Sequence, residues 1–223
     1  MTPWEKVDRS KIPGQEGELT LMKRGTEFSI RISGTELMNS RLHGSEDALA
    51  ELACRRMAQK PGRRILIGGL GMGYTLAAAL RHSEPDTHIT LAELIPSVVE
   101  WNRTHLGHLS GMPLDDPRVS VRIEDVAETI RRMKSAWDAI LLDVDNGPDG
   151  LTRKANNRLY DSPGLKAAFS ALRPEGILAV WSSGGDDAFT RRLKRCGFRT
   201  ETISVRGREP GKGARHTIWL AAR

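Results

Sequence analysis

Residues 64–75 read Arg64-Ile65-Leu66-Ile67-Gly68-Gly69-Leu70-Gly71-Met72-Gly73-Tyr74-Thr75. An apolar run leads into glycines at alternate positions, and an apolar pattern with helical spacing follows. Glycine lets a chain turn tightly from a strand into a helix, and lets its backbone come close to a ligand. The start of the helix then offers unpaired N–H groups. The pattern predicts a nucleoside-cofactor site, with a plain strand-to-helix turn as the alternative.

An acidic residue follows at the end of the next strand-like run. That run spans residues 87–93 and ends on Glu93. An acid about 20 residues beyond such glycines is placed to bind ribose hydroxyls. The spacing here is slightly longer, which fits a full helix between the two strands. We therefore expect Glu93 to hold a ribose; the alternative is a surface acid.

Composition limits the class of protein. The chain has 223 residues and a net charge of +6, enough for one large domain or for one domain with a small appendage. Its basic residues are scattered in pairs over predicted helices and loops, as on solvated faces, so nucleic-acid binding is not expected. Cys54 and Cys196 are far apart and form neither a disulfide framework nor a metal-ligand pattern.

No targeting or membrane segment is evident. The N-terminus lacks an apolar signal-peptide core, and the longest apolar stretch, residues 65–80, is broken by glycines and too short to span a bilayer. A cytoplasmic location is expected.

The first part of the chain differs in pattern from the rest. The first 17 residues predict a loosely held arm, and the alternation in 19–22 and 28–32 predicts a β-hairpin, with a short third strand at 36–39. A helix is predicted over 45–59. We expect residues 1–44 to form the arm and hairpin, and residues 45–223 the main domain.

Strands and helices then alternate. Strands are predicted at 63–68, 87–93, 118–123, 137–142, 175–182, 198–205 and 215–222. Helices are predicted at 72–83, 95–107, 125–134, 161–172 and 185–196. Alternation of this kind requires an α/β fold with a mostly parallel sheet of seven strands. The last two strands have no helix between them, so the final strand should be antiparallel.

Carboxylates follow two more of these strands, where the ends of parallel strands line a crevice. Asp125 could accept a hydrogen bond from an adenine amine, or cap the helix that follows. Asp143 and Asp145 come after a buried strand and before a Gly-Pro turn. Carboxylates grouped there suit proton abstraction from an amine or stabilisation of a cation; the alternative is that they only shape the turn.

The order of these segments resembles the Rossmann-like fold of class I S-adenosylmethionine-dependent methyltransferases, and more closely the spermidine synthases. The resemblance covers roughly residues 18 to 222. Its motifs are Gly68-Gly69-Leu70-Gly71-Met72-Gly73, Ala92-Glu93-Leu94-Ile95-Pro96, Glu124-Asp125-Val126, Asp143-Val144-Asp145-Asn146-Gly147-Pro148 and Leu172-Arg173-Pro174-Glu175-Gly176-Ile177-Leu178.

The resemblance implies a role for each motif. The residues expected to bind the donor are Gly69, Gly71 and Gly73 at its tail, Glu93 at the ribose, Ile95 and Asp125 at the adenine, and Asp143 at the amino group. Asp143 and Asp145 are the candidate catalytic residues, Asp145 as base or cation stabiliser at the acceptor. Asn146 and Tyr160 are expected on the acceptor side, and no metal is implied.

Three departures from the family bear on the reaction. Gly71 stands where the family has an Asp that contacts the donor's tail, and Ser45-Glu46 stands where it has a tyrosine. The segment after the aspartates carries Arg153, Lys154 and Arg158. These cations would repel putrescine and would suit an acceptor bearing a carboxylate or phosphate. Methyl transfer from S-adenosylmethionine to a small molecule is therefore the favoured reaction.

Two alternatives stay open. The first is a polyamine aminopropyltransferase that uses decarboxylated S-adenosylmethionine, favoured if Asp143, Asp145, Glu46 and Asp47 form an acidic cavity. The second is a non-catalytic cofactor-binding protein. A homodimer is also expected, because the hairpin offers an exposed edge and because spermidine synthases often dimerise through this region.

Overall fold

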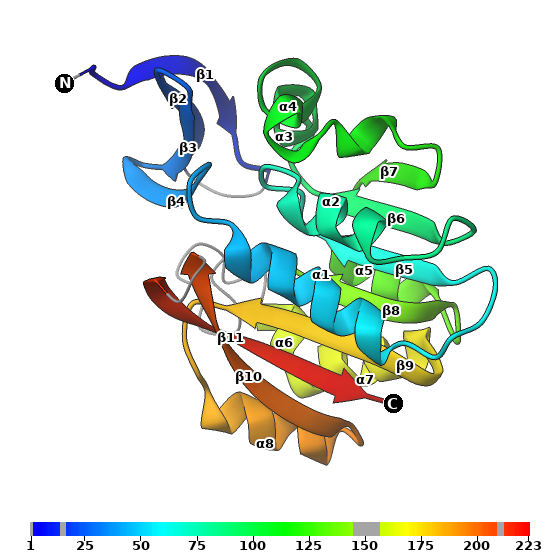
Figure 1. Cartoon of the computed structure of the whole chain (residues 1–223). Helices are drawn as coiled ribbons and strands as arrows, with labels where there is room; N and C mark the ends of the chain where they lie inside the picture. The colour runs from blue at the N-terminus through cyan, green and yellow to red at the C-terminus, as the bar shows by residue number, and fades with distance from the viewer. Residues whose placement is uncertain (1, 14–16, 145–156, 209–211) are drawn as a thin grey trace.

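The computed structural model describes residues 2–13, 17–144, 157–208 and 212–223. Two sheets organise these residues (Figure 1). The larger has seven strands in the order β10-β11-β9-β8-β5-β6-β7, and the smaller has four in the order β1-β2-β3-β4. No helix in these described ranges is long and apolar enough to cross a membrane.

The large sheet confirms the predicted Rossmann-like α/β fold. The five strands from β9 to β7 pair in parallel, and β11 is antiparallel to both of its neighbours, β9 and β10. A short loop can join two strands only when they run in opposite directions, which accounts for the antiparallel ending. The strands are β5 (Arg64–Gly68), β6 (His88–Glu93), β7 (Val119–Ile123), β8 (Trp137–Leu142), β9 (Leu172–Ser182), β10 (Arg199–Arg208) and β11 (Lys212–Ala222).

Helices cover both faces of this sheet and bury a separate apolar cluster on each. The helices of the first face are α1 (Gly44–Arg56), α2 (Tyr74–Arg81), α3 (Pro96–Trp101) and α4 (Gly107–Ser110). Those of the second face are α5 (Val126–Arg132), α6 (Asn157–Tyr160), α7 (Ser162–Ala171) and α8 (Asp187–Arg195). The continuous hydrophobic runs of β5 and β8 reflect burial on both sides.

The helix predicted over 95–107 is interrupted. A π-helical turn, Asn102–Leu106, separates α3 from α4. The Asn102 side-chain amide donates to the carbonyl of Gly71 (2.8 Å) and to that of Val98 (2.9 Å). This side chain therefore links the interrupted helix to the glycine turn after β5, and apolar periodicity carries no information about such a bond.

The expectation of a loosely held N-terminal arm is wrong. Residues Glu5–Lys11 form strand β1, which pairs antiparallel with β2 (Glu18–Arg24). The sheet continues with β3 (Glu27–Ile32) and β4 (Thr35–Asn39). The Trp101 indole N–H donates to Asp8 (2.6 Å), and Ser97 donates to Ser10 (2.8 Å). Backbone pairing and these contacts to α3 hold a segment too polar to be identified as a strand.

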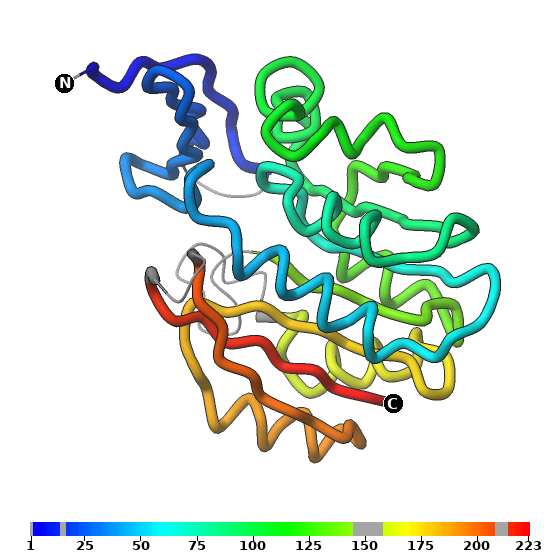
Figure 2. Tube along the Cα trace, in the orientation of Figure 1, coloured from blue at the N-terminus to red at the C-terminus, as the bar shows by residue number. Residues whose placement is uncertain are grey.

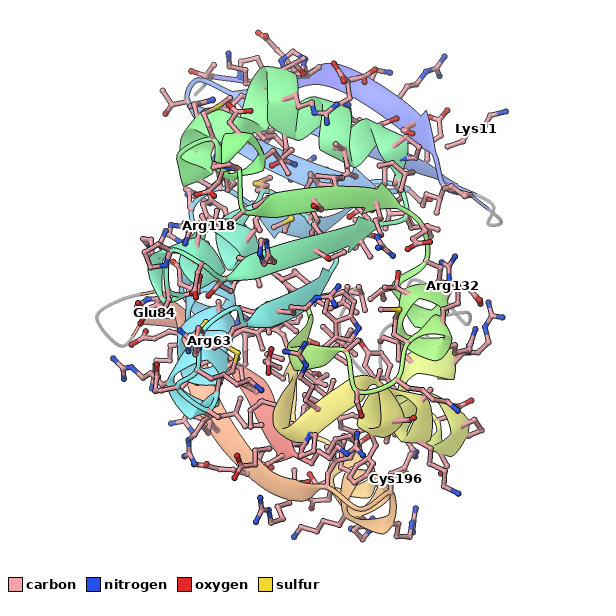
Figure 3. The ribbon with its side chains drawn as sticks, turned by 90° about the vertical axis from the view of Figure 1, so that its right-hand side faces the viewer. Lys11, Arg63, Glu84, Arg118, Arg132 and Cys196 are labelled. Atoms are coloured by element: carbon pink, nitrogen blue, oxygen red, sulfur yellow. The ribbon has the colours of Figure 1, made fainter. Side chains whose placement is uncertain are left out.

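The small sheet lies at the side of the large sheet where the parallel strands end. In Figure 3 the arrowheads of β6 and β7 point toward the side on which Lys11 lies, and Arg63, Glu84 and Arg118 lie on the opposite side. Tracing the chain in Figure 2 shows the small sheet leading directly into α1. The division into units at residue 44 stays a prediction.

One buried carboxylate links three strands, β5, β8 and β9, at the end of the large sheet that lies away from the small sheet. Asp138 is 4% exposed and accepts hydrogen bonds from the Arg64 N–H (2.8 Å) and the Arg173 guanidinium (2.7 Å), while Lys60 lies 2.6 Å away. Because the substitution leaves the Arg64 N–H without its acceptor and removes the partner of both cations, Asp138→Ala should lower the free energy of unfolding by about 1–3 kcal/mol.

Urea denaturation measures this change. Asp115→Ala, which removes an exposed carboxyl, is the control and should change stability by less than about 0.5 kcal/mol. Equal effects of the two substitutions would show that the buried cluster adds nothing.

Candidate functional site

A cavity of about 220 Å³ lies where the parallel strands end. The turn after β5, the ends of β6, β7 and β8, the start of α1 and the small sheet all contribute to it. Its lining residues are Ile12, Leu19, Ile30, Ile32, Leu37, Met38, Glu46, Gly69, Gly71, Ala92, Glu93, Leu94, Ile95, Val98, Glu124, Asp125, Val126, Asp143, Val144, Leu159 and Trp181.

The glycines after β5 have positive φ angles, 89° at Gly69, 53° at Gly71 and 84° at Gly73. A side chain at residue 69 would place its Cβ 2.3 Å from the Asp143 carbonyl oxygen, so only glycine fits there. Gly69 and Gly71 line the cavity. A Cβ on Gly73 would instead lie 2.8 Å from the Ser110 hydroxyl. Packing against this neighbouring segment therefore favours glycine at position 73, and the expected contact of Gly73 with a donor stays a prediction.

Glu93 is held by the backbone of two neighbouring turns. It is 7% exposed, and its two carboxylate oxygens accept hydrogen bonds from the N–H groups of Leu70 and Ile95, each at 2.8 Å. Glu93 also lines the cavity. Ile95 lies beside it in the cavity wall. Glu93 and Ile95, both predicted from the sequence to bind the donor, thus lie beside the glycine turn.

Asp125 caps a helix and also lines the cavity. It precedes α5, and its side chain accepts a hydrogen bond from the Ala127 N–H (2.9 Å). A single carboxylate can make this bond and keep acceptor capacity on the cavity side. The capping role is therefore observed, and the adenine role stays a prediction.

Two carboxyl groups, from Asp143 and Glu46, form the acidic end of the cavity. Asp143 follows β8 and accepts a hydrogen bond from the Thr75 hydroxyl (2.6 Å). Burial raises the pKa of Asp143 to about 6, against the lowering effect of that bond. Glu46 is 8% exposed, and burial followed by the Asp143 charge raises its pKa to about 7, while the Ser45 hydroxyl opposes the rise. Both groups thus lie where a bound cation would be stabilised.

The neighbouring Asp47 and His43 form a separate pair. Burial acts to raise the pKa of Asp47, but His43 (2.7 Å) and Arg81 (2.8 Å) outweigh it and lower that pKa. The His43 ring stacks on Tyr74 with centroids 4.1 Å apart. Of the acidic cavity considered from the sequence, the described residues therefore supply Asp143 and Glu46, whereas Asp47 serves this surface network.

The small sheet supplies an aliphatic wall to the cavity. Its residues there are Leu19, Ile30, Ile32, Leu37 and Met38. A side chain at position 71 would place its Cβ 2.8 Å from the Met38 sulfur, so Met38 occupies the space beside the glycine turn. Sequence reasoning missed this wall. Alternating apolar residues in the hairpin were visible, but not the side to which they would face.

Of the residues predicted on the acceptor side, only Tyr160 lies within the described part of the chain. Tyr160 is 2% exposed, donates to the Val144 carbonyl (3.4 Å) and packs edge-on against Phe189. It belongs to the apolar core of the second face, and its neighbour Leu159 lines the cavity. The structure thus places Tyr160 in the core, and its expected acceptor role stays a prediction. Asp145 and Asn146 lie outside the described residues.

The topology defines the class: a Rossmann-like α/β protein with the fold of class I S-adenosylmethionine-dependent methyltransferases. Residues 46–186 match the family model described as the spermine/spermidine synthase domain. Since that match covers more than half of the chain, the protein belongs to the spermine/spermidine synthase domain family.

Named relatives agree with this family. The chain is 32% identical over 128 residues to polyamine aminopropyltransferase 2 of Pseudomonas aeruginosa, covering 56% of this chain and 34% of the relative. It is 29% identical over 126 residues to a polyamine aminopropyltransferase of Korarchaeum cryptofilum, covering 56% and 37%. It thus spans little more than a third of these relatives' length.

The fold is also similar to a solved structure. The spermidine synthase from Thermotoga maritima superposes with a TM-score of 0.76 at 18% identity, covering 97% of this chain and 72% of that one. This likeness includes the small sheet and the last two strands, which lie outside the family match.

Glu93→Gln tests the hydrogen bonds that the Glu93 carboxylate accepts from the N–H groups of Leu70 and Ile95. An amide offers one oxygen and one N–H₂ group where two N–H donors now converge, so one backbone donor loses its partner. The free energy of unfolding should fall by about 1–3 kcal/mol, measured by chemical denaturation. Glu201→Gln, in an exposed ion pair with Arg56, should change it little. A Glu93→Gln protein as stable as wild type would contradict the contact.

Glu46→Gln tests the cost of burying the acid. With its pKa raised, Glu46 contributes stability below about pH 4 that is lost as the pH rises through about 7. The uncharged variant should therefore be more stable than wild type at pH 8, by about 2 kcal/mol, with little difference at pH 4.

Asp47→Asn is the matched control, with the opposite sign. Because the pKa of Asp47 is lowered, its stabilisation is present above its unfolded pKa and lost in acid. This variant should be less stable than wild type at pH 8 and nearly equal in acid. Thermal melts over this range measure both, and a Glu46→Gln protein less stable at pH 8 would refute the cost.

Proposed function

We propose that the protein is an aminopropyltransferase that uses decarboxylated S-adenosylmethionine as donor and a small polyamine as acceptor. The observation that carries this proposal is the pair of buried carboxyl groups, Glu46 and Asp143, beside the glycine turn in one cavity. The family and the names of the relatives support the same reaction.

The acid pair favours the decarboxylated donor on electrostatic grounds. A donor tail that ends in an ammonium gains a favourable interaction with nearby carboxylates. The tail of intact S-adenosylmethionine also carries a carboxylate, which would be forced toward the same two acids. Burying an unpaired ammonium is costly, so the carboxyls also suit a polyamine acceptor.

The remaining cavity residues fit the donor's adenosine. Glu93 lies in the cavity wall and would hold the ribose hydroxyls. Asp125 would accept from the adenine amine, and Ile95 would pack on the ring. Gly69 and Gly71 would let the backbone approach the tail, whose amino group Asp143 would bind. Each residue lines one continuous cavity, which supports this assignment.

The chemistry requires positioning and one proton acceptor. When bound, the donor supplies a methylene carbon activated by a neighbouring sulfonium, so that a C–N bond forms as the C–S bond breaks. The protein holds the acceptor amine in line with that bond, and fixing two reactants in this way can supply about 7–11 kcal/mol. An ionised Glu46 takes the proton that the acceptor's ammonium must lose before it attacks.

Methyl transfer, the reaction favoured from the sequence, lacks support. The reason for favouring it was a basic acceptor segment, of which Arg153 and Lys154 lie outside the described residues and Arg158 is exposed on α6. The acidic cavity and the relatives' names both favour the alternative. Catalytic or acceptor roles for Asp145 and Asn146, a homodimer and a cytoplasmic location stay predictions.

Donor discrimination tests the proposal. Calorimetry should show decarboxylated S-adenosylmethionine binding at least about tenfold more tightly than S-adenosylmethionine, because a charge-assisted hydrogen bond contributes roughly 1.5–3 kcal/mol. With spermidine or putrescine added, methylthioadenosine should form, detected by chromatography. Asp143→Asn should remove most of the preference.

Three results would count against it. Formation of S-adenosylhomocysteine would indicate methyl transfer, and binding without any product would indicate a non-catalytic protein. Equal affinity for the two donors would remove the role of the acid pair. The Asp115→Ala protein, altered far from the cavity, controls for preparation effects.

A further inference from the structure

Two hydrogen bonds continue from the cavity into the protein behind Glu46. The Ser45 hydroxyl lies 2.5 Å from a Glu46 carboxylate oxygen, and His216 Nδ1 lies 2.8 Å from the same hydroxyl oxygen. Ser45 is fully buried, Glu46 is 8% exposed and His216 is half-buried. A residue of the final strand is thus joined to an acid at the start of the first helix.

The fold brings these distant segments together through small residues. A Cβ on Gly44 would lie 3.3 Å from the carbonyl oxygens of Arg206 and Gly207, so α1 begins directly against the β10–β11 hairpin. A Cβ on Gly207 would lie 3.1 Å from the His216 ring. In Figure 2 the last described residues of β10 lie on the same side of the molecule as the start of α1.

The orientation of the ring is set by its neighbours. The His216 ring packs on Trp181 of β9 with centroids 5.0 Å apart, and Trp181 lines the same cavity as Glu46. The ring therefore lies between the hairpin, the indole and the Ser45 hydroxyl. Few rotations of the imidazole keep these contacts, so Nδ1 is held toward Ser45.

The hydrogen bonds that link Glu46, Ser45 and His216 can be arranged in two ways, according to whether Glu46 carries a proton. An ionised Glu46 only accepts, so Ser45 donates to it and His216 Nδ1 must carry a hydrogen that it donates to Ser45. A protonated Glu46 donates to Ser45 instead; Ser45 then donates to Nδ1, and the imidazole hydrogen resides on Nε2. Each charge state of Glu46 therefore pairs with one tautomer of a neutral His216.

We propose that His216 is a positioning residue that acts through Ser45 to hold the Glu46 carboxylate ionised and directed into the cavity. The Nδ1 hydrogen polarises the Ser45 hydroxyl and makes it a stronger donor to the carboxylate. The consequence for aminopropyl transfer rests on the proposed function, whereas the link between the charge of Glu46 and the His216 tautomer does not.

Other groups facing Glu46 act on it at the same time. The Asp143 charge disfavours its ionised form. His43, just before α1, favours that form, and the Tyr74 hydroxyl feels the charge of Glu46. Burial lowers the pKa of His216, which favours the neutral imidazole that the two tautomers require.

Nitrogen NMR of protein with ¹⁵N-labelled histidine tests the link without any substrate. His216, assigned by its loss in His216→Phe, should change from the Nε2–H to the Nδ1–H tautomer as the pH rises through the pKa of Glu46. Ser45→Ala and Glu46→Gln should each abolish the change, and exposed His82 should show none. A His216 tautomer that is constant, or that still changes in Ser45→Ala, would overturn the proposal.

Two substitutions then separate hydrogen bonding from packing. His216→Phe keeps a ring on Trp181 but removes the donor, and should lower kcat by about fivefold with KM little changed, the loss expected for one hydrogen bond of about 1 kcal/mol. Its acidic pH limb should move to higher pH. His216→Asn places an amide N–H near the Nδ1 position and should restore most of kcat.

The activity outcomes distinguish the two proposals. Equal loss in His216→Phe and His216→Asn would indicate packing and overturn the positioning role. If the wild-type protein transfers no aminopropyl group, the proposed function fails, and the NMR titration alone still decides whether His216 follows the charge of Glu46.

Discussion

The contact between Gly69 and the backbone of Asp143 is the constraint on which the rest of the site depends. A Cβ on Gly69 would lie 2.3 Å from the Asp143 carbonyl oxygen, so the turn after β5 can close against the end of β8 only without a side chain. Closure places the Asp143 carboxyl beside Thr75 at the start of α2. Glu93 then fixes the other side of the turn through Leu70. The turn after β5 thus brings the ends of β5, β6 and β8 together at one cavity.

Burial destabilises the ionised carboxyl groups of this site and thereby determines its chemistry. Two carboxyl groups lie close together away from water, and the pKa of each is raised because neither is well solvated. Such acids favour a bound cation and can accept a proton near neutral pH. Hydrogen bonds from Thr75 and Ser45 offset part of this cost.

The acidic end also shows how this chain differs from the pattern that its family resemblance implies. Position 71 would be acidic in that pattern, but here it is glycine, and Met38 of the small sheet lies where a side chain would begin. The second carboxyl comes instead from Glu46 on α1.

The sequence by itself determined the order of strands and helices, the antiparallel ending, and the placing of Gly69, Glu93 and Asp125 at the ends of the strands, where they line the cavity. Each follows from local rules: apolar periodicity marks a strand, and parallel strands end at one edge. Only the tertiary structure decided that residues 5–11 form a strand, that Tyr160 packs in the core, and that Ser110 leaves no room for a side chain at position 73. Each of these depends on contacts between segments far apart in the chain. Glu46 is the clearest case, since an acid in the first turn of a helix is ordinarily exposed, and here the segment after β8 and strand β11 pack around it.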